Sequence, residues 1–215
     1  MAYKATVIPV MIASPGDVIE ERDVIRSVIY DWNDINSSAS KVILIPVGWE
    51  TNISPELGAR PQEIINIRIL EDCDLLVGVF WTRIGTPTGK AKSGTVEEIE
   101  EHIKSGKPAM IYFSSKPVAP ESLDSVQYSE VQSFKDKCKK RGLVEEFENI
   151  EQFKQKFAKQ LPLCLSHNSY IQSLIVSSKT IITSNQNNEI SKEEIKLSEE
   201  AKKLLKAADP DRRTT

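Results

Sequence analysis

Apolar runs alternate with helical patterns through residues 1–115 of the chain. Four runs predict buried strands, at Ala5–Ala13, Val42–Val47, Leu75–Trp81 and Ala109–Phe113. Each run is short and almost continuously apolar, as in parallel strands that are covered on both faces. Apolar residues at helical spacing between the runs predict crossover helices. The alternation therefore predicts an α/β fold built on a doubly wound parallel sheet.

Three helices are expected between these strands. The first begins at Asp17, which stands at the capping-box distance from Glu20. The second begins near Pro61, because proline suits the first turn of a helix. The third begins at Thr95, with Glu98 at the same capping-box distance, and ends at a Ser-Gly-Lys-Pro turn.

The pattern changes after residue 116. It predicts a helix, a short edge strand, a second helix and a charged amphipathic helix, at Tyr128–Arg141, Val144–Phe147, Ile150–Leu165 and Ser191–Ala208. We therefore expect an α/β domain over residues 1–116 and its helical completion over 117–165. A helical C-terminal extension, over residues 166–215, is expected to combine a polar linker with the amphipathic helix.

Composition and charge narrow the class of protein. The 215 residues are 40% apolar and 27% charged, with three cysteines, which excludes collagen, low-complexity disorder and a disulfide scaffold. A net charge of −3 gives no bulk attraction to nucleic acid or acidic membranes. No apolar stretch reaches the roughly 18 residues of a membrane span. We expect a cytoplasmic protein whose first apolar run is a buried strand and not a signal peptide.

Several kinds of chemistry have no support in the sequence. It lacks a P-loop, a GxGxxG fingerprint, an HExxH zinc motif and a GxSxG nucleophile elbow. His102 and His167 are its only histidines, and no Cys/His cluster has the spacing of metal ligands. We therefore expect no metal site. Carboxylate chemistry remains, in the loops after the strands, where ligands of doubly wound sheets bind.

The first candidate site is Ser14-Pro15-Gly16-Asp17, directly after the first strand. A glycine-containing turn that leads into a helix N-terminus exposes backbone N–H groups, which can receive phosphate or ribose hydroxyls. The alternative is a plain connecting turn with an Asp cap, because every strand-helix unit needs one.

The second candidate site follows the third strand. Trp81 and Arg83 stand at the expected ligand edge, and Gly85 follows them. At that edge a Trp can stack on a base and an Arg can pair with a phosphate. Trp49 follows the second strand at the same edge and is included with them. The alternative is a buried Trp beside a surface Arg.

The third candidate site is the run from Ser93 to Glu101. In one interpretation Thr95 caps the helix and Glu98 completes its capping box. In the other, a carboxylate at the mouth of the cleft faces an anomeric carbon and stabilises an oxocarbenium-like transition state or attacks it. One glutamate can serve both roles.

These motifs together resemble a known family. The segments SPGDVIEERDVI, PQEIINIRILEDCDLLVGVFWTRIGTPTG and SGTVEEIEEHIKSGKPAMIYFS are similar to the family called domain of unknown function 4062 (DUF4062). That family is related to the nucleoside 2-deoxyribosyltransferases and to TIR domains. The resemblance covers about residues 5–115 and extends towards 165. It implies a flavodoxin-like or TIR-like sheet.

The resemblance also implies roles for single residues. The GT-x-x-E motif carries the catalytic role onto Glu98, with Thr95 as its motif neighbour. The turn of Ser14, Pro15, Gly16 and Asp17 would line the phosphate or ribose side, while Trp81 and Arg83 would flank the base.

The function implied is cleavage of an N-glycosidic bond in NAD or in a nucleoside or nucleotide, in a bacterial anti-phage defence effector. NAD would be a substrate, no other cofactor is expected, and a homo-oligomer or a defence-system partner protein is implied. The SPGD turn differs from that of the transferases, so hydrolysis and transfer both remain open. Two alternatives stand beside the enzyme, a non-catalytic nucleotide-sensing adaptor that oligomerises and a pure interaction module.

Overall fold

The computed structural model describes residues 2–48, 70–89 and 91–177. The expected helix after Pro61, the residue Trp49 and the expected amphipathic helix Ser191–Ala208 lie outside the described residues. The chain divides into two compact units, Met1–Ser173 and Leu174–Thr215, and the sheet and its helices belong to the first.

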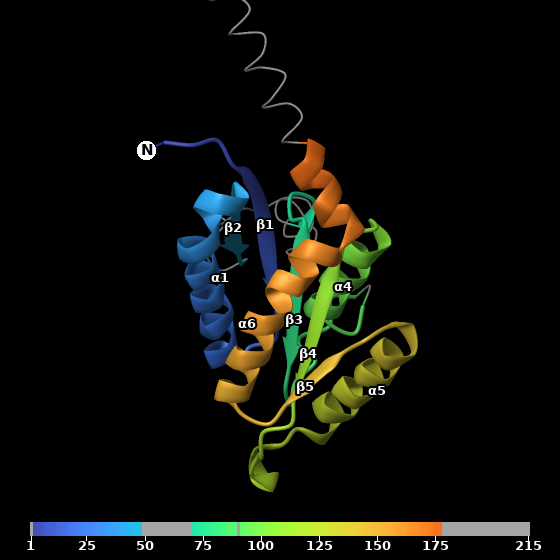
Figure 1. The fold of residues 1–215 in the computed structure, drawn as a ribbon. Helices are drawn as coiled ribbons and strands as arrows, with labels where there is room; N and C mark the ends of the chain where they lie inside the picture. Colours follow the sequence, from blue (N-terminus) through green and yellow to red (C-terminus); the bar gives the residue numbers. More distant parts are fainter. Residues whose placement is uncertain (1, 49–69, 90, 178–215) are drawn as a thin grey trace, which may run out of the picture. The chain divides into compact units, whose positions relative to one another are not determined.

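Five parallel strands form one sheet in the order β2-β1-β3-β4-β5, as Figure 1 shows. The strands are β1 (Thr6–Ala13), β2 (Val42–Val47), β3 (Leu75–Phe80), β4 (Ala109–Ser114) and β5 (Glu145–Phe147). This order is that of flavodoxin-like doubly wound sheets. The predicted α/β fold class is confirmed, and β5 is the predicted short edge strand.

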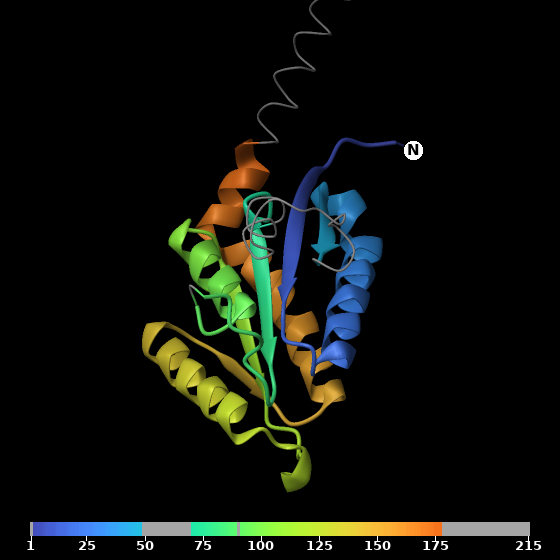
Figure 2. The same cartoon turned by 180° about the vertical axis from the view of Figure 1, so that it is seen from behind.

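Helices cover both faces of the sheet. They are α1 (Ile19–Ser40), α4 (Gly94–Lys104), α5 (Ser125–Arg141) and α6 (Ile150–His167), with the short 3-10 helix η2 (Pro120–Ser122) before α5. Helices α1 and α6 lie on one face, and α4 and α5 lie on the other, as Figures 1 and 2 show from opposite sides. The crossover connections thus place the strand ends, and the loops that follow them, along a single edge.

Aromatic packing holds the ends of β3 and β4 in place. Phe80 stacks on Phe113 with a centroid separation of 5.5 Å, and Phe134 of α5 contacts Phe80 at 5.2 Å. On the other face, Tyr112 meets the edges of Phe153 and Phe157 of α6. These rings are buried, and each contributes stabilisation beyond its area. The loops after β3 and β4 therefore start from a rigid base.

Helix α1 begins two residues later than the sequence predicts. Its N-cap position is Val18, and no side chain caps it. The expected capping box of Asp17 and Glu20 is therefore wrong. The carboxylate of Asp17 accepts hydrogen bonds from the loop after β3 instead.

Helix α4 begins at Gly94, so the expected N-cap at Thr95 is also wrong. Ser93 has extended backbone angles, and its hydroxyl accepts a hydrogen bond from the N–H of Val96 at 3.1 Å. The choice of Ser93 follows from the preceding loop, which folds back so that Gly94 N–H donates to Thr86 O. Glu98 consequently lies beyond the first turn and is no part of a capping box.

Residues 169–177 are helical, whereas the sequence predicts a polar linker from residue 166. Tyr170 donates its hydroxyl to Asp74 at 2.7 Å, which ties the start of this segment to the residue just before β3. Within the described ranges, no helix has the length and apolar character needed to cross a membrane.

Candidate functional site

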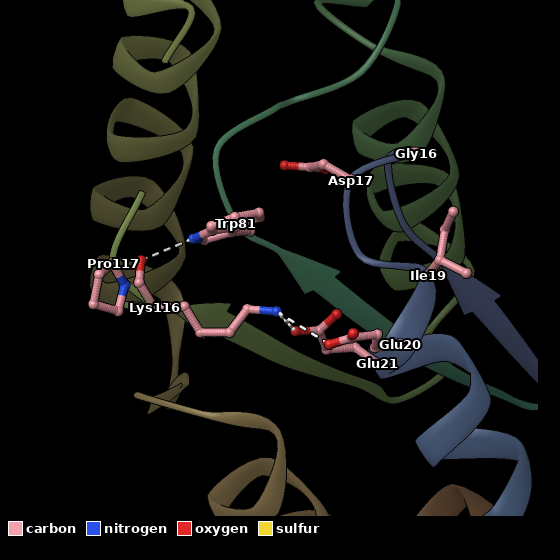
Figure 3. A pocket seen from close by; sticks show the side chains of 8 residues that line it. All are labelled: Gly16, Asp17, Ile19, Glu20, Glu21, Trp81, Lys116 and Pro117. Atoms are coloured by element: carbon pink, nitrogen blue, oxygen red, sulfur yellow. Dashed lines mark hydrogen bonds and ion pairs between the residues drawn. The ribbon is translucent and has the colours of Figure 1, made fainter. Parts of the chain in front are cut away.

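The loops after β1, β3 and β4 meet at a pocket of about 420 Å³ (Figure 3). Its lining is Gly16, Asp17, Ile19, Glu20, Glu21, Trp81, Lys116 and Pro117. Strand β1 lies between β2 and β3, so the chain reverses its direction of travel across the sheet there. Ligands of doubly wound sheets bind at this switch point, outside the carboxyl ends of the strands. The pocket is therefore where the topology predicts a ligand.

Asp17 joins the loop after β1 to the loop after β3. Its Oδ2 atom accepts the N–H and the hydroxyl of Thr82, both at 2.9 Å, and the N–H of Arg83 at 3.0 Å. Three donors on one carboxylate oxygen form a strong, charge-assisted anchor. The Oδ1 atom is buried and has no hydrogen-bond partner among the residues that the structure describes.

The next two amides of the same loop are held from the other side. Gln127, in the first turn of α5, accepts the N–H groups of Ile84 at 3.0 Å and Gly85 at 3.2 Å through its Oε1 atom. Four consecutive backbone N–H groups, from Thr82 to Gly85, are thus bonded to side chains. A loop whose amides are already paired is not an open anion-binding nest.

Arg22 supports the turn after β1 from behind. Arg22 is 7% exposed. Its Nε–H donates to Ser14 Oγ at 2.7 Å, and a second guanidinium N–H donates to Pro15 O at 2.6 Å. Ser14 and Pro15 are therefore held by protein groups and do not line the pocket. Arg22 belongs to the SPGDV-x-x-ER motif, whose spacing places it one helical turn from the loop, but its support of the turn is not evident from the sequence.

Trp81 and Lys116 form the wall opposite α1. The indole Nε1 donates to Lys116 O at 3.0 Å, and the Lys116 ammonium lies 4.8 Å from the centre of the Trp81 ring. The same ammonium is 2.7 Å from Glu21 Oε1 and 3.9 Å from Glu20 Oε2. Figure 3 shows these side chains converging from the loops after β3 and β4 and from the first turn of α1. Lys116 was missed because no local motif marks a residue two positions after a strand.

The pocket is acidic. Its lining carries three carboxylates, Asp17, Glu20 and Glu21, against the single ammonium of Lys116, which gives a formal charge of −2. Glu21 is fully buried, and its Oε2 atom has no hydrogen-bond partner within the described part of the chain. A buried carboxylate oxygen without a donor favours a ligand that brings a hydroxyl, an N–H or positive charge.

The structure brings some of the predicted site residues together and separates others. Gly16, Asp17 and Trp81 line the pocket, whereas Arg83 is exposed and contributes only its backbone N–H to Asp17. Gly85 lies against the start of α4, where an added Cβ would come within 3.6 Å of Thr95 Oγ1. Gly85 and Thr95 therefore belong to the contact between the β3 loop and the start of α4, and neither lines the pocket.

Glu98 is 5% exposed on α4, and it is not among the residues that line the pocket. Its burial shows that the carboxylate is not a solvated surface group. The sequence places it in a capping box, whereas the structure places it in the second turn of a buried helix face, beside Ile99 and one turn before His102.

Other reactive groups lie away from the pocket and are buried or partly buried. Burial raises the pKa of the Cys73 thiol to about 12 and that of Cys138 to about 11, so neither thiol is a ready nucleophile. Burial lowers the pKa of His102 to about 4, and its ring bonds Pro108 O at 3.0 Å. Over residues 2–48, 70–89 and 91–177, no cluster of acidic, His and Cys side chains has the arrangement of a metal site.

Comparison with known proteins adds a family. A family model described as a domain of unknown function (DUF4062) matches residues 9–162, which include every residue that lines the pocket and all of the sheet except the first three residues of β1. No curated protein matches the chain.

Two solved structures are similar at low identity. A conserved protein from Enterococcus faecalis V583 is 11% identical, with a TM-score of 0.37 over 70% of this chain and 99% of that one. A short-chain flavodoxin associated with a non-canonical PDU bacterial microcompartment is 16% identical, with a TM-score of 0.35 over 73% and 96%.

Proposed function

The chain belongs to the DUF4062 family, and on that basis we propose that it binds NAD or another nucleotide or nucleoside and cleaves its N-glycosidic bond. One observation carries the proposal. The pocket at the switch point combines an aromatic wall, Trp81, with the carboxylates of Asp17, Glu20 and Glu21. An aromatic ring supports stacking on a base, and carboxylates suit ribose hydroxyls and positive charge that develops at the sugar.

The reaction needs a negative group near the sugar. The bond between C1′ and the base nitrogen breaks, and its electron pair leaves with the base. Positive charge develops on C1′ and the ring oxygen, and a carboxylate stabilises it. Water then adds to C1′ and loses a proton, so that NAD and water yield ADP-ribose, nicotinamide and a proton. Transfer to a second base would replace water with that base.

Two buried glutamates compete for the role of that carboxylate. The resemblance to deoxyribosyltransferase-like and TIR-like proteins assigns it to Glu98. The pocket itself offers Glu21, which is fully buried, lines the cavity and faces Lys116. A Gln at either position keeps the size of the side chain and removes its charge, so the two assignments are separable.

The test is incubation of the purified chain with NAD and, separately, with purine and pyrimidine nucleosides, with products resolved by chromatography. We expect nicotinamide or free base from the unmodified chain. Loss of product in Glu98→Gln alone would support Glu98, and loss in Glu21→Gln alone would support Glu21. Turnover that survives in both variants would contradict a carboxylate mechanism.

The position of Glu98 favours a second candidate function. Because Glu98 is absent from the described lining of the pocket, the same cavity can serve a nucleotide-sensing adaptor that cleaves nothing. That function predicts saturable nucleotide binding without product, together with a ligand-dependent change in association state. A cytoplasmic role in anti-phage defence, with a homo-oligomer or a partner protein, is proposed for either function on the resemblance alone.

A further inference from the structure

We propose that the pocket selects its ligand by charge, accepting a heterocycle with delocalised positive charge and leaving phosphate groups outside. This inference rests on the proposed function, because it names the class of substrate that the same pocket takes. It predicts that an oxidised, pyridinium-type nucleotide binds and that its reduced, neutral counterpart of the same size and phosphate charge binds poorly.

The lining of the pocket carries a net negative charge. Three carboxylates surround one ammonium, and that ammonium is already 2.7 Å from Glu21. The guanidinium of Arg22 is directed to Ser14 and Pro15 and does not line the cavity. A phosphate in this pocket would lie among like charges, whereas a cation would be attracted.

The first four amides of the loop after β3, from Thr82 to Gly85, are not free to bind a phosphate. Phosphate sites in comparable folds use unpaired backbone N–H groups. Here the four amides from Thr82 to Gly85 are bonded to Asp17 and Gln127. Breaking those bonds to admit a phosphate would leave a carboxylate oxygen unpaired inside the protein.

This site already accommodates a cation. The Lys116 ammonium lies over the Trp81 ring at 4.8 Å and beside Glu21, so an aromatic ring and a buried carboxylate face the same charge. Glu21 retains a second oxygen, Oε2, that is buried and without a hydrogen-bond partner in the described residues. The negative charge of this buried carboxylate and the face of the indole ring together favour a flat cationic ring over a neutral one.

The experiment compares two pairs of probes by calorimetry, with product analysed after each titration. NAD⁺ and NADH differ by one positive charge on the nicotinamide ring, and 1-methylnicotinamide and nicotinamide differ similarly without any phosphate. We expect the cation of each pair to bind at least about tenfold more tightly at low salt, with the gap narrowing as salt screens the carboxylates.

Glu20→Gln is the informative variant, because its side chain is 75% exposed and its removal leaves the core intact. We expect it to weaken binding of NAD⁺ by roughly threefold to tenfold and to leave NADH unchanged. Glu101→Gln is the matched control. It removes an exposed carboxylate near the C-terminal end of α4, outside the pocket lining, and should change neither affinity.

Each outcome decides the inference. Preference for both cations, reduced by Glu20→Gln alone, supports it, even if no nicotinamide is released and the cleavage proposal fails. Equal affinities within the pairs, or failure of all four probes to bind, would overturn it. Release of nicotinamide without any preference for the cations would overturn the charge selection and keep the proposed cleavage.

Discussion

Asp17 Oδ2 accepts both the backbone N–H and the hydroxyl of Thr82, each at 2.9 Å, across 65 residues of sequence. This contact sets the distance between the loops after β1 and β3, which form two walls of the pocket. Because Trp81 immediately precedes Thr82, the same contact also fixes where the indole ring lies. Asp17 is thus a positioning residue as well as a lining residue.

Asp17→Ala should lower the free energy of unfolding by about 2–4 kcal/mol, because three donors lose a charged acceptor. Urea unfolding monitored by circular dichroism would measure it. Asp23→Ala is the control, since its carboxylate is 71% exposed and pairs with Arg26 on the same helix. We expect a change within about 0.5 kcal/mol there, and a similar small change for Asp17→Ala would show that the two loops are held by other contacts.

Lys116→Met and Glu21→Gln should be non-additive. Each single change removes one partner of a partly buried ion pair, in which the Lys116 side chain is 21% exposed and that of Glu21 is 1% exposed. We expect each to cost about 2–3 kcal/mol, and Lys116→Met in particular leaves a buried carboxylate unpaired. The double variant should lose less than the sum, with a coupling above about 1 kcal/mol. The exposed pair Lys104–Glu101, 3.5 Å apart, should give a coupling below about 0.5 kcal/mol in the same urea assay.

Gly85→Ala should destabilise the protein, whereas Gly16→Ala should not. Gly85 has a φ of +107°, and an added Cβ would come within 3.2 Å of the Ser93 Cβ, so we expect a loss of about 2–3 kcal/mol. An added Cβ at Gly16 meets nothing within 4 Å. Equal melting temperatures for the two variants would contradict the account of the β3 loop as a fixed support of α4.

His102 should make stability depend on pH. Burial lowers its pKa from 6.5 to about 4, so the unfolded chain takes up a proton at a pH where the folded protein does not. Stability from this residue is complete above pH 6.5 and falls as the pH drops towards 4, by about 3 kcal/mol in total. Urea unfolding at several pH values would measure the slope.

The control for this prediction is the second histidine. His102→Gln should flatten the slope between pH 6.5 and 4, although it lowers stability at neutral pH. His167 is exposed at the end of α6, and His167→Gln should leave the slope as it is. An unchanged slope in His102→Gln would mean that other groups cause the acid destabilisation.

The fold was predictable because it depends on apolar runs that any parallel sheet must bury. The runs at Val42–Val47 and Leu75–Trp81 match β2 and β3 to within one residue. Strand order was not read from the runs themselves, yet the crossover rules left few orders to consider. The ligand edge followed from the same rules, and Gly16, Asp17 and Trp81 do line the pocket there.

The site was less predictable, because its contacts join distant parts of the chain. Asp17 and Glu20 have the spacing of a capping box, and nothing local indicates that Thr82 takes the carboxylate instead. Ser93 and Thr95 both suit an N-cap, and the fold of the preceding loop decides between them. Lys116 belongs to no motif at all. Periodicity records burial, whereas pairings across a sheet edge depend on tertiary structure.

The most direct test of the central claim is the release of nicotinamide from NAD by the purified chain, followed by chromatography, beside Glu98→Gln and Glu21→Gln. The account predicts nicotinamide and ADP-ribose in equal amounts from the unmodified chain. It predicts a loss of at least about a hundredfold in rate in one of the two variants, because that variant lacks the negative charge that stabilises the transition state. Full turnover in both variants, or no product from any nucleotide or nucleoside, would contradict it.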